Sequence, residues 1–370
     1  MRIKHHFQVW SAILILSVLA LCMLLYTPVW AASSGPRANT NAASTTSINA
    51  NAYLTGQMLQ PLFQSDINQQ LPAAVASVIS SMIDQLPQAD QGWGTQMANA
   101  LLQPSATLLS LNPESSGLLI TFKVDLYSGD PKPTTTSLLI GFQVINSTTI
   151  QVSALGNNGL VSGPLLTFQM PIGSPNSVSS TPNCGDADLK INLKYPVTLG
   201  SSLATSSQRS SATTPLSYRR ANASASTPGS YVEIPDSSLA QIGSAIGSIP
   251  VTSSLTAQNI QVYTQGSNLA IQAQIHWLGI DIGTAVSLMK PGAAGGNLVV
   301  TVQQTNLEYF NGLITFPVNQ YNQKIQQIVD AKFNGALTDF TVTQAAIGAN
   351  SHIPCVSSTS LVLGGTTNLD

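Results

Sequence analysis

Charged side chains are scarce in this sequence. Asp, Glu, Lys and Arg together make up 8% of the 370 residues, and the formal net charge is −2. Globular proteins usually contain about 25% charged residues. The basic residues form no cluster larger than Arg219-Arg220, whereas binding to nucleic acid or to an anionic lipid surface depends on clustered Lys and Arg. The composition therefore argues against a nucleic-acid partner and against electrostatic attachment to a membrane.

Histidine is also rare, which limits the chemistry that the chain can perform. Only His276 and His352 lie beyond the N-terminal segment. His352 precedes Cys355 by three residues, but no orienting carboxylate or strand-to-helix nucleophile turn accompanies this pair. Residues 183–188, Asn-Cys-Gly-Asp-Ala-Asp, lack the glycine turn and the closing Glu of a calcium loop, so they predict a turn that leads into a strand. We predict a protein that is not an enzyme and has no cofactor and no metal site.

The sequence has only three cysteines. Cys22 lies in an apolar N-terminal run, which leaves Cys184 and Cys355 in the rest of the chain. An even number of cysteines in an exported protein predicts a disulfide, and two buried free thiols are the alternative. The bridge would close a very long loop and would stabilise the folded state by about 4 to 5 kcal/mol in the chain-entropy model.

One uninterrupted apolar run occurs near the N-terminus, at residues 9–26. It follows a short basic stretch and is followed by Pro28 and a small-residue motif that ends at Ala31. Residues 1–31 therefore predict either a signal peptide or an uncleaved anchor that attaches the protein to the cell membrane. Both interpretations place the rest of the chain in the extracellular space or the cell envelope. Residues 32–51 have no periodicity and predict a disordered tether.

Beyond this tether the pattern predicts two helix-plus-sheet units, at residues 52–200 and 231–370, joined by a Ser/Thr-rich linker or loop at residues 201–230. In each unit a helical stretch, with apolar residues every three or four positions, precedes strands with apolar residues at every second position. The first helical stripe runs from Leu59 to Leu86. We expect it to pack against a sheet or to line an apolar cavity.

Four strand segments of the first unit have counterparts in the same order in the second unit. Both series end on similar motifs, Leu-Leu-Thr-Phe at residues 165–168 and Leu-Ile-Thr-Phe at residues 313–316, each shortly before a proline. Such self-similarity predicts an internally duplicated unit. The predicted fold class is α+β, with twisted antiparallel β-sheets curled around long amphipathic helices.

Part of the second unit resembles a known family. The stretch from Ser254 to Pro317 has an alternating strand that runs into Leu278-Gly279, a glycine-containing turn before a Leu-Val-Val strand, and a strand that leads to a proline before a helix. In this order of features it is similar to the LmeA-like family of exported bacterial phospholipid-binding proteins. The resemblance implies the fold of the tubular lipid-binding superfamily (TULIP-like), in which a curled sheet wraps a long helix around a lipid-holding tunnel.

The resemblance implies a non-enzymatic protein that binds phospholipid or another amphiphile in the bacterial cell envelope, for storage or for transfer. The runner-up is an extracellular structural or adhesive protein with a solid core, because a packed core and a lipid cavity need the same apolar faces. If the first hypothesis holds, apolar residues of three segments are candidates to line the lipid site. These nine candidates are Leu59, Phe63, Ile67, Ile271, Ile275, Trp277, Ile325, Ile328 and Phe333.

Overall fold

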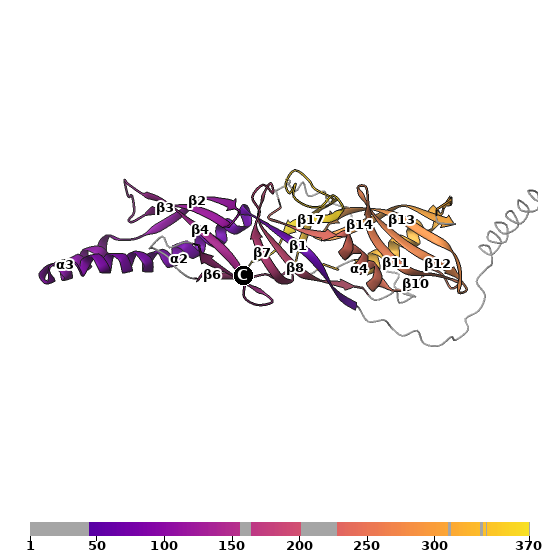
Figure 1. Cartoon of the computed structure of the whole chain (residues 1–370), viewed down its shortest axis with the longest axis horizontal. Helices are drawn as coiled ribbons and strands as arrows, with labels where there is room; N and C mark the ends of the chain where they lie inside the picture. The colour runs from indigo at the N-terminus through magenta and orange to yellow at the C-terminus, as the bar shows by residue number, and fades with distance from the viewer. Residues whose placement is uncertain are drawn as a thin grey trace, which may run out of the picture. The chain divides into compact units, whose positions relative to one another are not determined.

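The computed structural model describes most of the chain beyond the predicted tether. The described residues are 44–155, 164–200, 228–309, 312–333, 336–337 and 339–369. The predicted signal peptide or anchor at residues 1–31 and most of the predicted linker lie outside the described residues. Within them the protein is a mixed α+β fold built mostly of antiparallel sheet, as the sequence predicts (Figure 1).

One six-stranded antiparallel sheet, here called the central sheet, takes three strands from each half of the chain. Its strand order is β16-β17-β9-β1-β8-β7. Because β1 pairs with β9, the two predicted units share this sheet, and all the described residues belong to one body. The strands are β1 (Ser44–Thr55), β7 (Ser174–Ser180), β8 (Ala187–Leu199), β9 (Ser230–Pro235), β16 (Thr341–Ile347) and β17 (Ser360–Thr366).

Each of the other two sheets is an antiparallel meander, in which strands that follow one another in the chain lie side by side. The first meander sheet consists of β2 (Ser105–Glu114), β3 (Gly117–Asp125), β4 (Thr134–Val144), β5 (Thr149–Ala154) and β6 (Pro164–Gln169). The second meander sheet consists of β10 (Ile249–Pro250), β11 (Leu255–Gln265), β12 (Asn268–Trp277), β13 (Ile280–Ala294), β14 (Asn297–Tyr309) and β15 (Ile314–Pro317).

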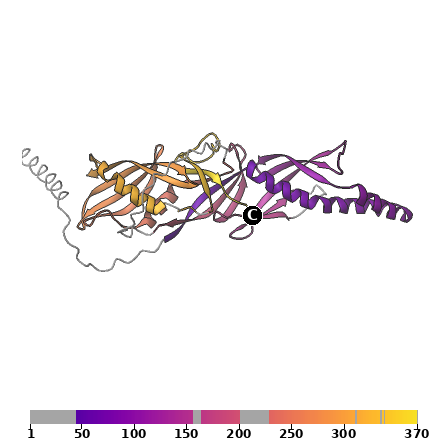
Figure 2. The same cartoon turned by 180° about the vertical axis from the view of Figure 1, so that it is seen from behind.

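Four α-helices accompany the sheets in the described part of the chain. They are α2 (Gly56–Ile83), α3 (Gln88–Leu101), α4 (Asp236–Ile246) and α5 (Asn322–Phe333), and the short 3-10 helix η1 (Asn319–Tyr321) precedes α5. The main contacts of α2 are with β2, those of α4 with β11, and those of α5 with β14. Seen from both sides, α2 runs along the first meander sheet and, with α3, extends beyond it (Figures 1 and 2).

The predicted disordered tether is wrong for residues 44–51, which belong to β1. Residues Ile48, Ala50, Ala52 and Leu54 of this strand alternate and are buried. Hydrogen bonds to β8 on one side and to β9 on the other hold the strand inside the central sheet. The sequence did not reveal it because two of these four core residues are alanines, whose weak hydrophobicity gives little periodic signal. Residues 32–43 of the predicted tether lie outside the described residues.

The predicted disulfide between Cys184 and Cys355 is confirmed. It joins the turn before β8 to the connection between β16 and β17, and the two Cα atoms are 5.1 Å apart although 171 residues separate them in sequence. A structural disulfide fits an exported protein in an oxidising compartment. In the described part of the chain, no helix has both the length and the hydropathy needed to span a membrane.

Candidate functional site: the apolar faces of the meander sheets

The first meander sheet has one apolar face. Residues directly opposite each other in an antiparallel pair share a face, and the registers bring the alternating apolar residues of β2 to β6 together. Some of them, such as Ile140 and Ile150, are fully buried. Others pack against the same core but remain partly exposed, namely Phe122, Leu138, Phe142, Val144 and Leu166. The face is therefore mostly apolar but incompletely covered.

Amide side chains of α2 fasten the helix to β2, one edge of this sheet. The Nε2 atom of Gln64 donates to the carbonyl oxygen of Ala106 (2.6 Å), and its Oε1 atom accepts from the backbone N–H of Leu108 (2.6 Å). The backbone N–H of Ala106 donates to Oδ1 of Asn68 (2.8 Å). These bonds satisfy backbone groups that an edge strand would otherwise leave unpaired.

The same helix also reaches the other edge of the sheet, at β6. The Nε2 atom of Gln70 donates to the carbonyl oxygen of Leu165 (2.5 Å) and to the carboxylate of Asp66 (3.0 Å). In the order β2-β3-β4-β5-β6, β2 and β6 are the two outer strands. One helix is thus hydrogen-bonded to both edges of a five-stranded sheet.

The second meander sheet holds its helix in a similar way. The Nε2 atom of Gln326 on α5 donates to the carbonyl oxygen of Val300 (2.8 Å), and its Oε1 atom accepts from the backbone N–H of Val302 (2.7 Å). Sequence reasoning missed these glutamines. A Gln on the polar face of a helix has the same pattern in sequence whether it meets water or the edge of a sheet.

Between α4 on β11 and α5 on β14 lie the two middle strands, β12 and β13. The predicted alternation of β12 is confirmed at Leu269 and Ala273, which are buried in the core. Ile271 and Ile275 lie on the same face and pack against that core, but both remain partly exposed. The apolar face of this sheet is therefore also incompletely covered.

The structure divides the nine predicted lining residues into two groups. Leu59, Phe63 and Ile67 belong to α2, beside the first meander sheet, whereas the other six belong to β12 and α5 of the second. Leu59 is 0% exposed and Phe63 is 2% exposed, so both are core residues. The remaining seven are partly exposed. These seven are Ile67, Ile271, Ile275, Trp277, Ile325, Ile328 and Phe333.

The predicted apolar stripe of the first helix is buried only at its N-terminal end. Leu59 and Phe63 are its buried residues, and beyond Ile67 the stripe is half-exposed or exposed. The exposed large side chains recur every four residues on α2 and its following turn, and again on α3, which puts each set on one helix face. No Lys or Arg occurs between residues 38 and 122. The exposed set comprises Val78, Met82, Leu86, Trp93, Met97 and Leu101.

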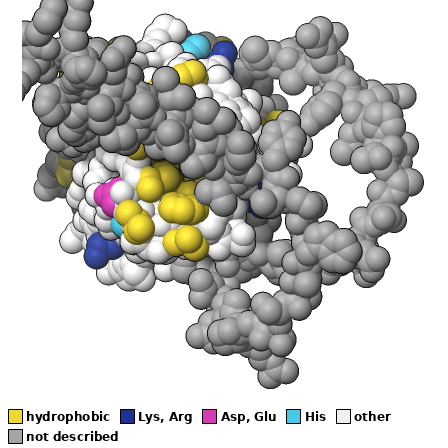
Figure 3. Space-filling view, turned by 90° about the vertical axis from the view of Figure 1, so that its right-hand side faces the viewer, with side chains coloured by type: hydrophobic (Ala, Val, Ile, Leu, Met, Phe, Trp, Pro, Cys, Tyr) yellow, Lys and Arg dark blue, Asp and Glu magenta, His cyan; other side chains and the backbone are white. Residues whose placement is uncertain are grey.

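Apolar side chains also gather at the end of the second meander sheet that Figure 3 faces. Leu278 and Ile280 project from the turn between β12 and β13. Leu313, which is 83% exposed, directly precedes β15, and Phe316 lies within that strand. In this view an acidic, a basic and a histidine side chain lie at one side of the apolar cluster (Figure 3). Both meander sheets thus carry exposed apolar groups away from the central sheet.

One buried carboxylate is fully occupied by structural hydrogen bonds. Glu233 on β9 is 4% exposed. Its two oxygens accept from Nδ2 of Asn51 (2.7 Å), the hydroxyl of Tyr53 (2.8 Å), the backbone N–H of Ser357 (3.0 Å) and Oγ of Ser360 (2.9 Å). Burial alone would raise the pKa of Glu233, but these hydrogen bonds lower it below its ordinary value. The carboxylate therefore joins β1, β9 and the segment before β17, and none of this points to catalysis.

Cys355 and His352 form no nucleophile pair, as the sequence predicts, although a carboxylate that the sequence did not reveal lies beside His352. Cys355 is bonded to Cys184, so it offers no thiolate for covalent catalysis. The Nδ1 atom of His352 lies 2.8 Å from the carboxylate of Asp186, beside the disulfide. Among the described residues, no group of three or more His, Cys, Asp and Glu side chains could hold a metal ion.

Comparison with known proteins gives little that identifies the chain. No protein-family model matches it, and no curated protein matches it. Among solved structures, the crystal structure of P47 of Clostridium botulinum E1 is similar over 88% of this chain and 100% of that chain, with a TM-score of 0.31 and 7% sequence identity. A TM-score this low is no evidence of a shared fold or a shared function.

Proposed function

We propose that this protein binds phospholipid or another amphiphile in the cell envelope, without catalysing a reaction. One observation carries the proposal: the apolar face of the first meander sheet is incompletely covered, while α2 is hydrogen-bonded to both of its edge strands. The ligand we propose would lie against the partly exposed residues of that face and against α2. The half-exposed face between α4 and α5 offers similar contacts in the second meander sheet.

The bonds from α2 to both edges support a sheet that curls around the helix. Neighbouring strands lie about 4.8 Å apart, so the outer strands of a flat five-stranded sheet would be about 19 Å apart. A helix with its side chains is only about 10 to 12 Å wide. Gln64 bonds to β2 and Gln70 bonds to β6. A sheet that bends toward the helix would bring both edge strands within reach of these two side chains. A curled sheet with an apolar inner face is the arrangement that we propose for the ligand site.

Such a site needs no charged group to hold a lipid. Burying an acyl chain contributes about 0.8 kcal/mol for each CH₂ group. The partly exposed face offers aromatic and aliphatic surface for this purpose, including Phe122, Leu138 and Phe142. The absence of Lys and Arg between residues 38 and 122 is therefore compatible with lipid binding, and it argues against recognition of a phosphate group by α2, α3 or β2.

We also propose that the exposed apolar sets at the ends of the meander sheets contact the membrane. Trp93 is 65% exposed on α3, and Leu313 is 83% exposed at β15. Tryptophan and long apolar side chains favour the boundary between the headgroups and the acyl chains of a bilayer. If residues 1–31 are retained as an anchor, they would hold the protein at the same membrane.

We further propose that the chain contains an internally duplicated unit, and that the second copy is related to the LmeA-like family. The strand order of the central sheet supports a duplication. Read from either edge, two consecutive strands (β7 and β8, or β16 and β17) are followed by the first strand of their own half, β1 or β9. These first strands pair antiparallel with Ala52 opposite Val232, and each leads directly into a helix. A two-fold relation between the halves would produce this order.

A pair of neighbouring leucines on β4 provides a matched test. Leu138 lies on the proposed ligand face and Leu139 lies on the opposite face, and both are partly exposed. We expect Leu138→Gln to weaken saturable binding of a fluorescent fatty acid by at least roughly fivefold, because it removes apolar contact area. Leu139→Gln should bind as the wild type does. Equal effects of the two substitutions, or no saturable binding by the wild type, would contradict the proposed site, provided that circular dichroism shows both variants folded.

A structural or adhesive role with a solid core is the second candidate function. The full burial of Leu59 and Phe63 favours this alternative, because side chains that line a lipid-holding tunnel would be exposed to that tunnel in the absence of a ligand. This alternative predicts that neither leucine substitution changes the binding of a hydrophobic probe, because no specific binding exists.

A further inference from the structure

Helix α2 carries one charged side chain on its whole length. It has 28 residues, and Asp66 is the only charged residue among them. Asp66 follows Leu62 by four positions and Phe63 by three, which places the three side chains on one face of the helix. Phe63 is buried, Leu62 packs against the core, and Asp66 is half-buried. The single charge of α2 therefore lies on the side of the helix that faces the first meander sheet.

Hydrogen bonds place this carboxylate beside β6. The Nε2 atom of Gln70 lies 3.0 Å from each carboxylate oxygen of Asp66, and it also donates to the carbonyl oxygen of Leu165 on β6. The next residue of that strand, Leu166, is one of the partly exposed apolar residues of the proposed ligand face. Asp66 therefore lies where α2 meets the β6 edge of that face.

No cationic side chain accompanies Asp66 in the described part of the chain, since neither of the two ion pairs found there includes it. Burial raises the pKa of Asp66 above its ordinary value, and the hydrogen bond from Gln70 lowers it by less. An ionised carboxylate can accept about four hydrogen bonds, so Gln70 leaves acceptor capacity unused. A half-buried negative charge without a cation is unfavourable, and a positively charged partner would stabilise it.

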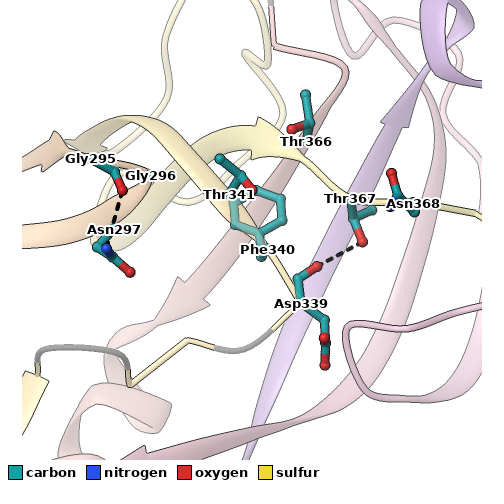
Figure 4. A pocket seen from close by; sticks show the side chains of 9 residues that line it. All are labelled: Gly295, Gly296, Asn297, Asp339, Phe340, Thr341, Thr366, Thr367 and Asn368. Atoms are coloured by element: carbon teal, nitrogen blue, oxygen red, sulfur yellow. Dashed lines mark hydrogen bonds between the residues drawn. The ribbon is translucent and has the colours of Figure 1, made fainter.

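A polar pocket elsewhere in the molecule shows no comparable selectivity. It has a volume of about 430 Å³ and is lined by residues 295–297, 339–341 and 366–368 (Figure 4). In this view the carboxylate of Asp339 points away from the other lining residues (Figure 4). The other polar side chains there are mostly exposed amides and hydroxyls, which suit many kinds of polar ligand.

The carboxylate of Asp66, in contrast, selects among amphiphiles by charge. An anionic head group beside it would be repelled, and α2, α3 and β2 contain no Lys or Arg to offset the repulsion. A divalent cation would need several more oxygen ligands than one carboxylate supplies. An alcohol donates one hydrogen bond but brings no charge. A primary ammonium group brings a positive charge and three N–H donors, and charge-assisted hydrogen bonds are the strong ones.

We propose that the amphiphile bound by the first meander sheet carries a primary amine, whose ammonium group donates hydrogen bonds to the carboxylate of Asp66. This inference rests on the proposed function and adds the class of ligand. The apolar chain of the ligand lies against Phe142 and Leu166, which share the inner face of the sheet on either side of Val152. Apolar contact supplies the affinity, and Asp66 supplies the preference for an amine.

Displacement of a neutral hydrophobic dye, diphenylhexatriene, from the exported protein tests this preference. Dodecylamine and dodecanol have the same chain and differ in the head group, and an alkylamine is cationic at pH 7, as a Lys side chain is. We expect dodecylamine to displace the dye at a concentration at least roughly fivefold lower than dodecanol does, because only the amine forms a charged hydrogen bond with Asp66. In Asp66→Asn the two compounds should be equally effective. This variant should fold, as circular dichroism can check, because it removes a charge that burial disfavours.

The matched control is Asp84→Asn, which removes a charge at the C-terminal end of the same helix and should keep the preference for the amine. Equal displacement by the two compounds in the wild type, or the same preference in Asp66→Asn as in the wild type, would overturn the amine assignment and leave amphiphile binding intact. Loss of the preference in Asp84→Asn would overturn it too, because a general surface charge would then be its source. A dye that does not bind, or that neither compound displaces, would overturn the proposed function and the amine assignment together.

Discussion

At the scale of single residues, two carboxylates of the central sheet have pKa values shifted in opposite directions. Hydrogen bonds from four donors outweigh burial and lower the pKa of Glu233. Burial, and then the charge of Asp186, raises the pKa of Asp188 to about 6. Gly56 leaves room for Asp188, because a Cβ atom at that position would lie 2.7 Å from its Oδ2 atom. Neither residue faces the proposed ligand, so these shifts concern stability.

The raised pKa of Asp188 predicts a pH-dependent cost in stability. The folded protein binds this proton more tightly than the unfolded chain, whose pKa is near 3.8, so stability falls as the pH rises from about 4 to about 6. We expect Asp188→Asn to increase the free energy of unfolding at pH 7 by about 1 kcal/mol. Direct conversion of the pKa shift into free energy would give a larger value, but the carboxylate is partly exposed to solvent, which screens its charge.

Urea unfolding of wild type and Asp188→Asn between pH 4 and pH 7 would check this prediction. The difference between the two proteins should be small near pH 4 and should grow toward pH 7. Glu233 has the opposite sign, since its lowered pKa gives stability that is lost as the pH falls, but it is present in both proteins and cancels. A difference that shrinks with rising pH would show that Asp188 is stabilised as a carboxylate.

At the scale of secondary-structure elements, alternation of strong hydrophobic residues was the reliable signal. It identified β3 through Leu118 and Ile120, and it identified β12 through Leu269 and Ala273. It missed β1, whose periodicity rests partly on alanines and whose stability comes from pairing on both sides. Helical periodicity predicted α2. It could not show that most of the α2 stripe is solvent-exposed, because a local pattern does not reveal where the sheet ends.

The exposed helical segment predicts contact with a bilayer. Of the four tryptophans, only Trp93 and Trp277 lie in the described part of the chain. In a chain that starts at Thr40, Trp277→Phe leaves Trp93 as the single reporter on α3. We expect its emission to shift to shorter wavelength with phospholipid vesicles and to be quenched by brominated lipids. The effect should persist in high salt, because the segment has no basic residue.

A matched variant tests whether the other exposed apolar side chains of α3 contribute to vesicle binding. Met97→Ser combined with Leu101→Ser keeps Trp93 but removes the other exposed apolar residues of α3. It should reduce vesicle binding severalfold, since each buried CH₂ contributes about 0.8 kcal/mol. Unchanged Trp93 emission with vesicles in the parent protein would contradict membrane contact by this segment.

At the scale of the whole molecule, the central sheet joins the two halves of the chain. Its strands β7, β8 and β9 lie between the two meander sheets in the sequence. The α+β class and the order of the alternating strands follow from the sequence, because they depend on local alternation. The candidate site was only partly predictable. Ile67, Ile271 and Ile275 are half-exposed on apolar faces as a lining residue would be, but Leu59 and Phe63 are core.

Native mass spectrometry of the exported protein, purified without detergent, tests the central claim most directly. A parallel organic extract of the same sample would identify any released molecule. The amphiphile-binding account predicts a discrete added mass that equals the mass of an extracted lipid and that decreases in Leu138→Gln but not in Leu139→Gln. A bare protein mass that persists after incubation with envelope lipids would contradict the account, and the half-exposed apolar faces would then be surfaces of a solid structural protein.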